Sequence, residues 1–159
     1  MRTDCEVVEW ARQESEQARC GDARLTKRLG LLLTKLGQSP GMSIPQACNG
    51  RHAEIAAAYR FFDNPAANPE NILGAHLQQS LIRMAEQSTV LLVQDTTEMD
   101  MSQPQRRIQG AGPLDDSPRQ GAFVHLMHAF TMEGTPLGSV WHKLLVRTPR
   151  PVDKAVARP

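Results

Sequence analysis

The residue with the clearest chemical potential in this chain is Asp95, which follows the apolar run Val90 to Val93. A carboxylate on or at the end of a buried strand is costly unless it is hydrogen-bonded or binds a cation. Two-metal phosphoryl-transfer enzymes place acids in this way to hold Mg²⁺. The alternative is a turn-forming aspartate that caps the amides of Thr96 and Thr97. The residues alone favour the turn, and the metal ligand stays open as a second interpretation.

Other candidate ligands do not complete a metal site around Asp95. Asp115 and Asp116 fall in a segment rich in Gly and Pro, where we expect both carboxylates to be solvated. His125 and His128 are three residues apart on an expected strand, so their side chains point to opposite faces of it. The three cysteines are odd in number and lack the spacing of metal ligands, so neither a zinc site nor a disulfide framework is indicated.

A second group of candidates is basic. From Cys20 to Phe62 the chain carries six Lys and Arg residues and two acids, a local balance of +4 in a chain whose net charge is +1. A basic helix face contacts DNA phosphates, but a solvated face is the alternative, and the charge pattern alone favours it. Tyr59 and Arg60 form a neighbouring candidate. On the helix expected from Asp22 to Leu36, one face carries four basic residues: Arg24, Lys27, Arg28 and Lys35.

The first half of the chain, which would position this basic face, has the patterns of helices. We expect a helix from Val7 to Ala18 and a second one that begins at the N-cap Asp22. Shorter helical segments follow near Ser43 and from Ala53 to Tyr59. Asn68-Pro69-Glu70 predicts the start of a last helix. Apolar residues at helical spacing indicate the buried side of that helix: Leu73, Leu77, Leu81 and Met84.

The second half, which carries Asp95, has the patterns of strands. Thr89 to Val93 is a short β-branched and apolar run. Residues 102–120 have the composition of a loop. Ala122 to Thr131 and Leu137 to Val146 predict two strands joined by a hairpin-like turn. Helices followed by strands indicate an α+β chain, and three strands without a following helix leave one face of the sheet without a cover.

Bulk properties exclude several classes of protein. An apolar fraction of 40% and a charged fraction of 22% allow a packed core and argue against general disorder. The acidic N-terminus has no apolar run, so we expect no signal peptide, and no stretch approaches the roughly 20 apolar residues that span a bilayer. We therefore expect a cytoplasmic protein with no membrane partner.

Four segments taken together resemble one family, the insertion-sequence-four and transposon-five transposases. Gly21 to Leu29 resembles the signature that opens the N-terminal domain of that family, and Ser43 to Cys48 and Ala57 to Asn64 match its later blocks in order. Leu91 to Thr97 is similar to its first catalytic strand, and Gly121 to Arg147 to its next two strands. This resemblance reverses both earlier preferences: Asp95 becomes a metal ligand, and the basic helix a DNA-contacting one.

The resemblance implies a fold and a domain organisation. Residues 1–68 would be an all-helical DNA-binding domain, and 69–147 a linking helix with the first three strands of a truncated ribonuclease-H-like domain. Residues 148–159 would be a disordered tail. The implied partners are double-stranded DNA at transposon ends and a second subunit, either another copy or a full-length transposase. The implied DNA contacts lie on the basic helix and on the helix that follows it: Arg24, Lys27, Arg28, Lys35, Tyr59 and Arg60.

The resemblance also implies a mechanism of the DDE type, in which two Asp and one Glu hold two Mg²⁺ ions for strand cleavage and transfer. Asp95 would be the first acid, while the second Asp and the Glu of the family lie further downstream than Pro159. We therefore expect a DNA-binding portion of a cut-and-paste transposase that is inactive alone. Two alternatives stay open: a regulatory inhibitor of a full-length transposase, and one part of an active enzyme split across reading frames.

Overall fold

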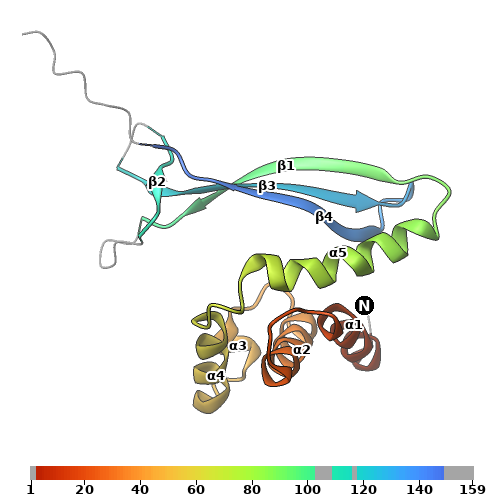
Figure 1. The fold of residues 1–159 in the computed structure, drawn as a ribbon, viewed down its shortest axis with the longest axis horizontal. Helices are drawn as coiled ribbons and strands as arrows, with labels where there is room; N and C mark the ends of the chain where they lie inside the picture. The colour runs from red at the N-terminus through yellow and green to blue at the C-terminus, as the bar shows by residue number, and fades with distance from the viewer. Residues whose placement is uncertain (1–2, 103–108, 116–117, 149–159) are drawn as a thin grey trace, which may run out of the picture. The chain divides into compact units, whose positions relative to one another are not determined.

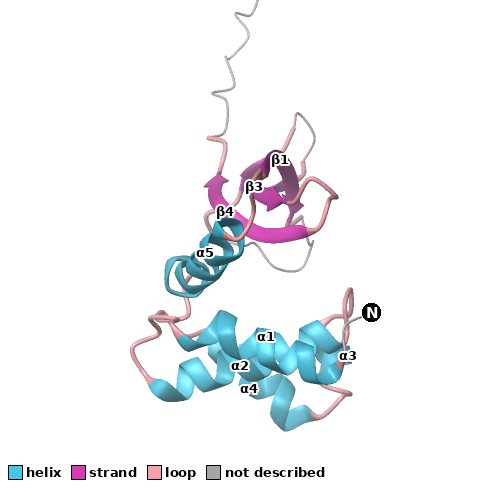
Figure 2. Cartoon of the chain, turned by 90° about the vertical axis from the view of Figure 1, so that its right-hand side faces the viewer, coloured by secondary structure: helices cyan, strands magenta, loops and turns pink. Residues whose placement is uncertain are grey.

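The computed structural model describes residues 3–102, 109–115 and 118–148, and it divides into two compact units, residues 1–90 and 91–159. The first unit is helical and the second is a β-sheet, so the chain is α+β (Figures 1 and 2). The tail expected at 148–159 lies outside the described residues apart from Thr148. No helix among the described residues is long and apolar enough to cross a membrane.

The helices begin where short polar side chains satisfy free backbone amides. Thr3 and Glu6 form a capping box at the start of the first helix, which therefore begins before the expected Val7. As predicted, Asp22 accepts a hydrogen bond from the Arg24 amide at 2.7 Å, and Asn68 caps the last helix. The helices are α1 (Asp4–Glu16), α2 (Ala23–Gln38), α3 (Ile44–Ala47), α4 (His52–Phe62) and α5 (Pro69–Ala85).

Two glycines of α2 allow α1 to pack closely against it. A Cβ atom at Gly30 would lie 2.9 Å from Ser15 Oγ, and one at Gly37 would lie 2.9 Å from Val7 Cγ1. The two glycines are seven residues apart and therefore share one face of α2. Their missing side chains bring α1 close enough for Val7 and Ala11 to be buried.

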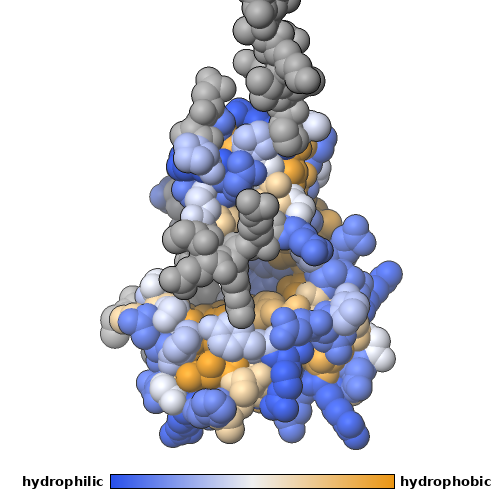
Figure 3. Space-filling view, turned by 90° about the vertical axis from the view of Figure 1, so that its left-hand side faces the viewer, coloured by the Kyte–Doolittle hydropathy of each residue, from blue (hydrophilic) through white to orange (hydrophobic). Residues whose placement is uncertain are grey.

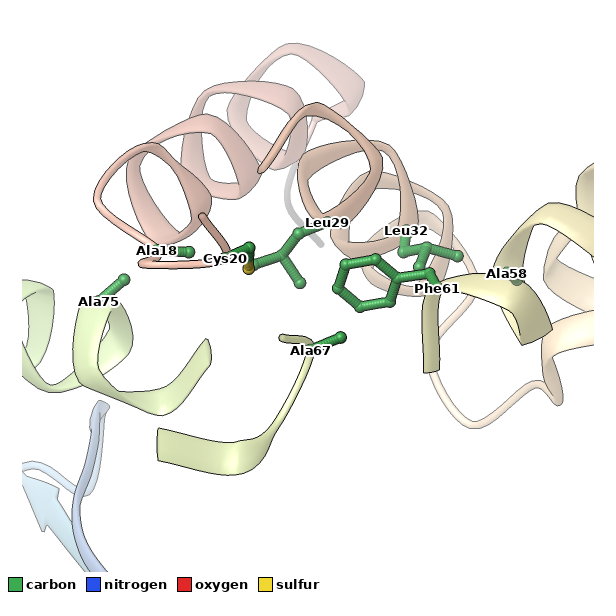
Figure 4. Packing of buried hydrophobic residues seen from close by; sticks show 8 residues of the cluster. All are labelled: Ala18, Cys20, Leu29, Leu32, Ala58, Phe61, Ala67 and Ala75. Atoms are coloured by element: carbon green, nitrogen blue, oxygen red, sulfur yellow. The ribbon is translucent and has the colours of Figure 1, made fainter. Parts of the chain in front are cut away.

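The core of the helical unit gathers around Phe61 of α4, whose exposed fraction is 2%. Figure 4 shows the Phe61 ring beside Leu29 and Leu32, which come from the leucine face of α2. The other members of this buried cluster are small: Ala18, Cys20, Ala58, Ala67 and Ala75. Small neighbours let the short helices approach one another around a single large aromatic side chain.

The last helix, α5, packs on α1 through polar groups rather than through its leucines. Glu14 of α1 is 3% exposed and accepts bonds from His76 Nδ1 at 2.7 Å and from Arg83 Nη1 at 2.8 Å. The buried residues of α5 are Ala75 and Ser80. The expected buried side was wrong in this respect, since Leu81 is 44% exposed. The periodicity of the leucines identifies an apolar face of α5. The face that packs on α1 is a different one, which carries His76 and Arg83.

These contacts also place α5 in the first compact unit, which extends to Val90. The expected division at residue 68 assigned this helix to the second domain. The backbone supports the observed grouping as well, because the Arg19 amide donates to the Asn71 carbonyl at 3.2 Å.

The second unit is a four-stranded antiparallel sheet centred on β3 (Gln120–Phe130). The strand β1 (Leu91–Asp100) pairs along one side of β3, while β4 (Pro136–Leu145) and the short β2 (Gly112–Pro113) pair along the other. The predicted hairpin of β3 and β4 is confirmed with ends shifted by one or two residues. The sequence pattern missed β2 inside the expected loop.

Two glycines are required where strands and loops meet in this sheet. A Cβ at Gly121 would collide with the carbonyl oxygen of Met99 on β1, and one at Gly112 would collide with the carbonyl oxygen of Arg147. The Arg147 side chain fixes the same corner, since Nη1 donates to the Leu114 carbonyl at 2.6 Å and the guanidinium lies over the Phe123 ring. The segment before β3 is therefore held to both neighbouring strands.

The sheet leaves much apolar surface in contact with solvent. Every residue of β1 is exposed, including Leu92 at 55%. Trp141 and Leu144 of β4 are 43% and 59% exposed. The helical unit also has apolar surface, and Figure 3 shows hydrophobic patches among hydrophilic side chains on the lower, helical part. Its exposed aromatic side chains, Tyr59 and Phe62, are both on α4.

Candidate nucleic-acid interface and candidate metal site

The outward face of α2 carries the basic residues expected from the sequence. Arg24 and Lys27 are exposed and Arg28 is half-buried, whereas Leu29 and Leu32 of the same helix are buried. No carboxylate of residues 3–102, 109–115 and 118–148 forms an ion pair with Arg24, Lys27 or Arg28. Three cations on one face without internal partners can exchange their counterions for phosphates.

Lys35 lies on the same face of α2 but has an internal partner. Its Nζ is 2.6 Å from Glu54 Oε2, an oxygen shielded from solvent at the start of α4. The hydrogen bond from Lys35 lowers the pKa of Glu54, and a weaker bond from Arg51 acts in the same direction. The structure therefore joins Lys35 to α4, a partnership that the spacing along α2 could not indicate.

The two candidates on α4 differ from one another. Tyr59 is 49% exposed, which leaves its ring accessible to solvent. Arg60 is exposed, and its Nε donates to the Ala56 carbonyl one turn earlier at 3.3 Å. Arg60 has no ion-pair partner in the described part of the chain, so its charge is available to a ligand.

The remaining basic residues of α1 and α5 are neutralised within the helical unit. Arg12 contacts Glu9 and Glu16 at 2.7 Å, and its hydrogen bond lowers the pKa of Glu9 to about 2. Arg83 binds the buried Glu14. Positive charge without an internal partner is thus concentrated away from α1, whose exposed side chains are predominantly acidic.

Asp95 lies in a different position from the one expected. The strand β1 continues to Asp100, so Asp95 is in its middle, opposite Leu126 of β3, and is exposed. The expectation of a carboxylate at the end of a buried strand was therefore wrong. Pairing with β3 extends the strand through polar residues whose pattern alone does not predict one.

The carboxylates nearest to Asp95 in sequence do not join it. Side chains alternate along a strand, so Glu98 and Asp100 fall on the face opposite Asp95. Both instead contact Arg119, at 3.0 and 3.6 Å, as does Asp115 at 2.8 Å. Asp115 is therefore paired rather than simply solvated, and Asp116 lies outside the described residues. The pKa of Asp100 is lowered, first by its hydrogen bonds with Ser102 and then by Arg119.

The described residues do not fit a two-metal site. No group of three or more His, Cys, Asp or Glu residues among them is placed to hold a metal ion. On the face of Asp95, the neighbours along β1 are Val93 and Thr97, and the residue opposite is Leu126. A divalent ion requires several converging oxygen ligands.

Sequence reasoning missed two groups of residues that organise the structure. Glu14 and His76 are 62 residues apart, and neither lies in a motif. Arg119 contacts three carboxylates, two on β1 and a third at Asp115. The only available signal was indirect, since buried or clustered charges require partners of opposite sign.

Comparison with known protein families supports the interpretation of the basic surface of the helical unit as a DNA-binding surface. Residues 8–67 match the family model described as transposase DNA-binding. This range includes α2, α3, α4 and most of α1, and it ends before α5 and the sheet. No curated protein matches the chain. Arg24, Lys27, Arg28 and Arg60, for which the described residues supply no ion-pair partner, lie inside the matched range. The match supports a transposase N-terminal DNA-binding domain in this part of the chain.

Proposed function

We propose that the helical unit binds duplex DNA at transposon ends, as part of a cut-and-paste transposase of the insertion-sequence-four and transposon-five type. The observation that carries the proposal is the row Arg24, Lys27 and Arg28, which have no ion-pair partner among the described residues. Tyr59 and Arg60 of α4 supply further contacts, and Lys35 contributes less because Glu54 already binds it. The match over residues 8–67 supports the assignment to DNA.

The test is a titration of labelled duplex DNA with the full chain at several salt concentrations. Replacing Arg24 and Arg28 together by Ala should weaken binding and reduce the slope of log K against log salt by about two, because each lost phosphate contact removes roughly 0.9. The control is Arg12→Ala, which removes one positive charge from α1, where Glu9 and Glu16 already pair with it, and should leave the slope unchanged. Equal slopes for the double variant and the parent would refute the proposal.

The second part of the proposal concerns the sheet. It would be the start of a ribonuclease-H-like catalytic domain, with Asp95 as the first of the three family acids and Mg²⁺ as the metal. Since the described residues bring no second carboxylate to the face of Asp95, residues 1–159 alone should not cleave or join DNA.

This second part is tested by incubating the chain with transposon-end DNA and Mg²⁺ or Mn²⁺, beside Asp95→Ala. We expect no nicking by either protein while DNA binding is retained. Nicking by the parent that disappears in Asp95→Ala would mean that acids from within the chain, or from a second copy, complete the site. Nicking by both proteins would indicate a contaminating nuclease, and the assay would be repeated after further purification.

A further inference from the structure

A groove lies within the helical unit, between the end of α1 and the first half of α5. It encloses about 620 Å³. Gly74 of α5 lines the groove, and a Cβ added there would have no atom within 4 Å, so the groove is open at this residue. The polar residues along the groove are Gln17, Arg19, Glu70, Asn71 and Gln78.

Arg19 is the cation of this groove. Its backbone amide donates to the Asn71 carbonyl at 3.2 Å, which fixes the loop after α1 against α5. Its side chain has no ion-pair partner in the described part of the helical unit, whereas Arg12, Arg51 and Arg83 each contact a carboxylate. Arg19 thus resembles Arg24, Lys27 and Arg28 of α2 in lacking an ion-pair partner among the described residues, although it lies outside that helix.

We propose that this groove binds a phosphate of the DNA backbone, with Arg19 as the charged donor. The inference rests on the proposed function, since it adds a second contact site to the same DNA-binding unit. A phosphate oxygen is recognised by guanidinium and amide N–H groups together, and the side-chain amides of Gln17 and Gln78 offer such donors. Asn71 has a structural role, because its side-chain amide donates to the Ala66 carbonyl at 3.0 Å.

Glu70 provides a second test, because removing its charge should change DNA affinity in the direction opposite to removing the charge of Arg19. Its carboxylate is exposed in the first turn of α5 and lines the groove. A negative charge beside a bound phosphate is repulsive and weakens binding. Removing the charge of Arg19 should therefore weaken DNA binding, and removing the charge of Glu70 should strengthen it. A purely structural role for the groove predicts neither change.

The experiment measures duplex DNA binding by the full chain with four groove variants at two or more salt concentrations. We expect Arg19→Ala to weaken binding roughly fivefold or more and to reduce the salt slope by about one. Glu70→Gln should bind more tightly than Glu86→Gln, which removes an exposed charge at the far end of α5. Gly74→Leu should fill the groove and weaken binding, while Gly74→Ala, which leaves it open, should bind as the parent does.

The outcomes separate this inference from the proposed function. If the parent does not bind DNA, both fail. If the Arg24 and Arg28 double variant is weakened while Arg19→Ala and Glu70→Gln bind as the parent does, the groove proposal is overturned and the proposed function stands. If Gly74→Leu loses helix content by circular dichroism, the charge variants Arg19→Ala and Glu70→Gln decide, because both side chains are exposed.

Discussion

The helical unit and the sheet unit satisfy their polar and apolar groups in different ways. In the helical unit, capping side chains satisfy helix starts, Phe61 fills a core, and the buried Glu14 has two basic partners. In the sheet unit, β1 pairs with β3 alone among the described strands and is exposed along its whole length. Local sequence signals build a unit that is largely complete within itself, whereas strands need partners from elsewhere in the chain.

The largest expected effect of this difference is on amide hydrogen exchange. Amides in α1 and α2 should exchange at least about a hundredfold more slowly than those along β1 and β4, because an open edge and exposed apolar side chains give little resistance to local opening. The measurement is native-state exchange followed by mass spectrometry of peptides from each unit. Equally strong protection in both units would show that the sheet is stable by itself or is completed by a second copy.

Two truncations to alanine, one in each unit, should show the next largest difference. Phe61→Ala should destabilise the helical unit by about 3–5 kcal/mol, the usual cost of a cavity left by a buried aromatic side chain. Leu92→Ala should change stability by only about 0.5 kcal/mol, since this side chain is 55% exposed. Urea unfolding followed by circular dichroism measures both effects. A large loss in Leu92→Ala would reveal an apolar partner that covers β1 in solution.

The sequence predicts those parts of the fold that depend on neighbouring residues. Asp22 and Asn68 are capping residues whose partners lie two or three positions away, so both helix starts were predictable. The hairpin of β3 and β4 was also predicted from its turn. The course of β1 beyond Val93 was not, because its polar residues become a strand only through pairing with β3.

The candidate sites also contain features that the sequence predicts and features that it does not. Helical spacing places the basic residues of α2 on one face, and the structure has them there. Spacing cannot reveal that Lys35 reaches Glu54, or that Glu98 and Asp100 contact Arg119 rather than approach Asp95. These outcomes depend on how separate segments pack, which no single segment determines.

A third prediction concerns pH and the attachment of α5. Burial alone would raise the pKa of Glu14, but hydrogen bonds and charges from His76 and Arg83 outweigh it and hold the pKa below its ordinary value. Because the pKa is lower in the folded state, this contribution is complete above the unfolded value and is lost as the pH falls through the folded one. Glu14→Gln should therefore cost about 2 kcal/mol near pH 7, a value reduced for the partial exposure of both partners.

The effect of the same substitution should shrink as the pH falls through the folded-state pKa of Glu14, because the parent carboxylate then becomes protonated itself. Urea unfolding of the parent and of Glu14→Gln over a series of decreasing pH values tests this convergence. Exposed Glu9 also has a lowered pKa, so Glu9→Gln serves as the control for general acid effects. A difference between the parent and Glu14→Gln that stays constant with pH would show that Glu14 contributes through shape rather than charge.

The smallest predicted effect distinguishes charges used inside the helical unit from charges available to DNA. Lys35 and Arg24 lie on one face of α2, but only Lys35 has an ion-pair partner among the described residues, Glu54 at 2.6 Å. DNA would have to replace that pair to bind Lys35, so Lys35→Ala should reduce DNA affinity about twofold or less, while Arg24→Ala should reduce it severalfold. Titrations of the same duplex at a single salt concentration provide the comparison.

The double variant Lys35→Ala with Glu54→Gln, which removes both members of the pair, should bind at least as tightly as the parent because it also removes an acid near the DNA. If Lys35→Ala weakens binding as much as Arg24→Ala does, the pair with Glu54 opens on DNA, and the interface includes the start of α4.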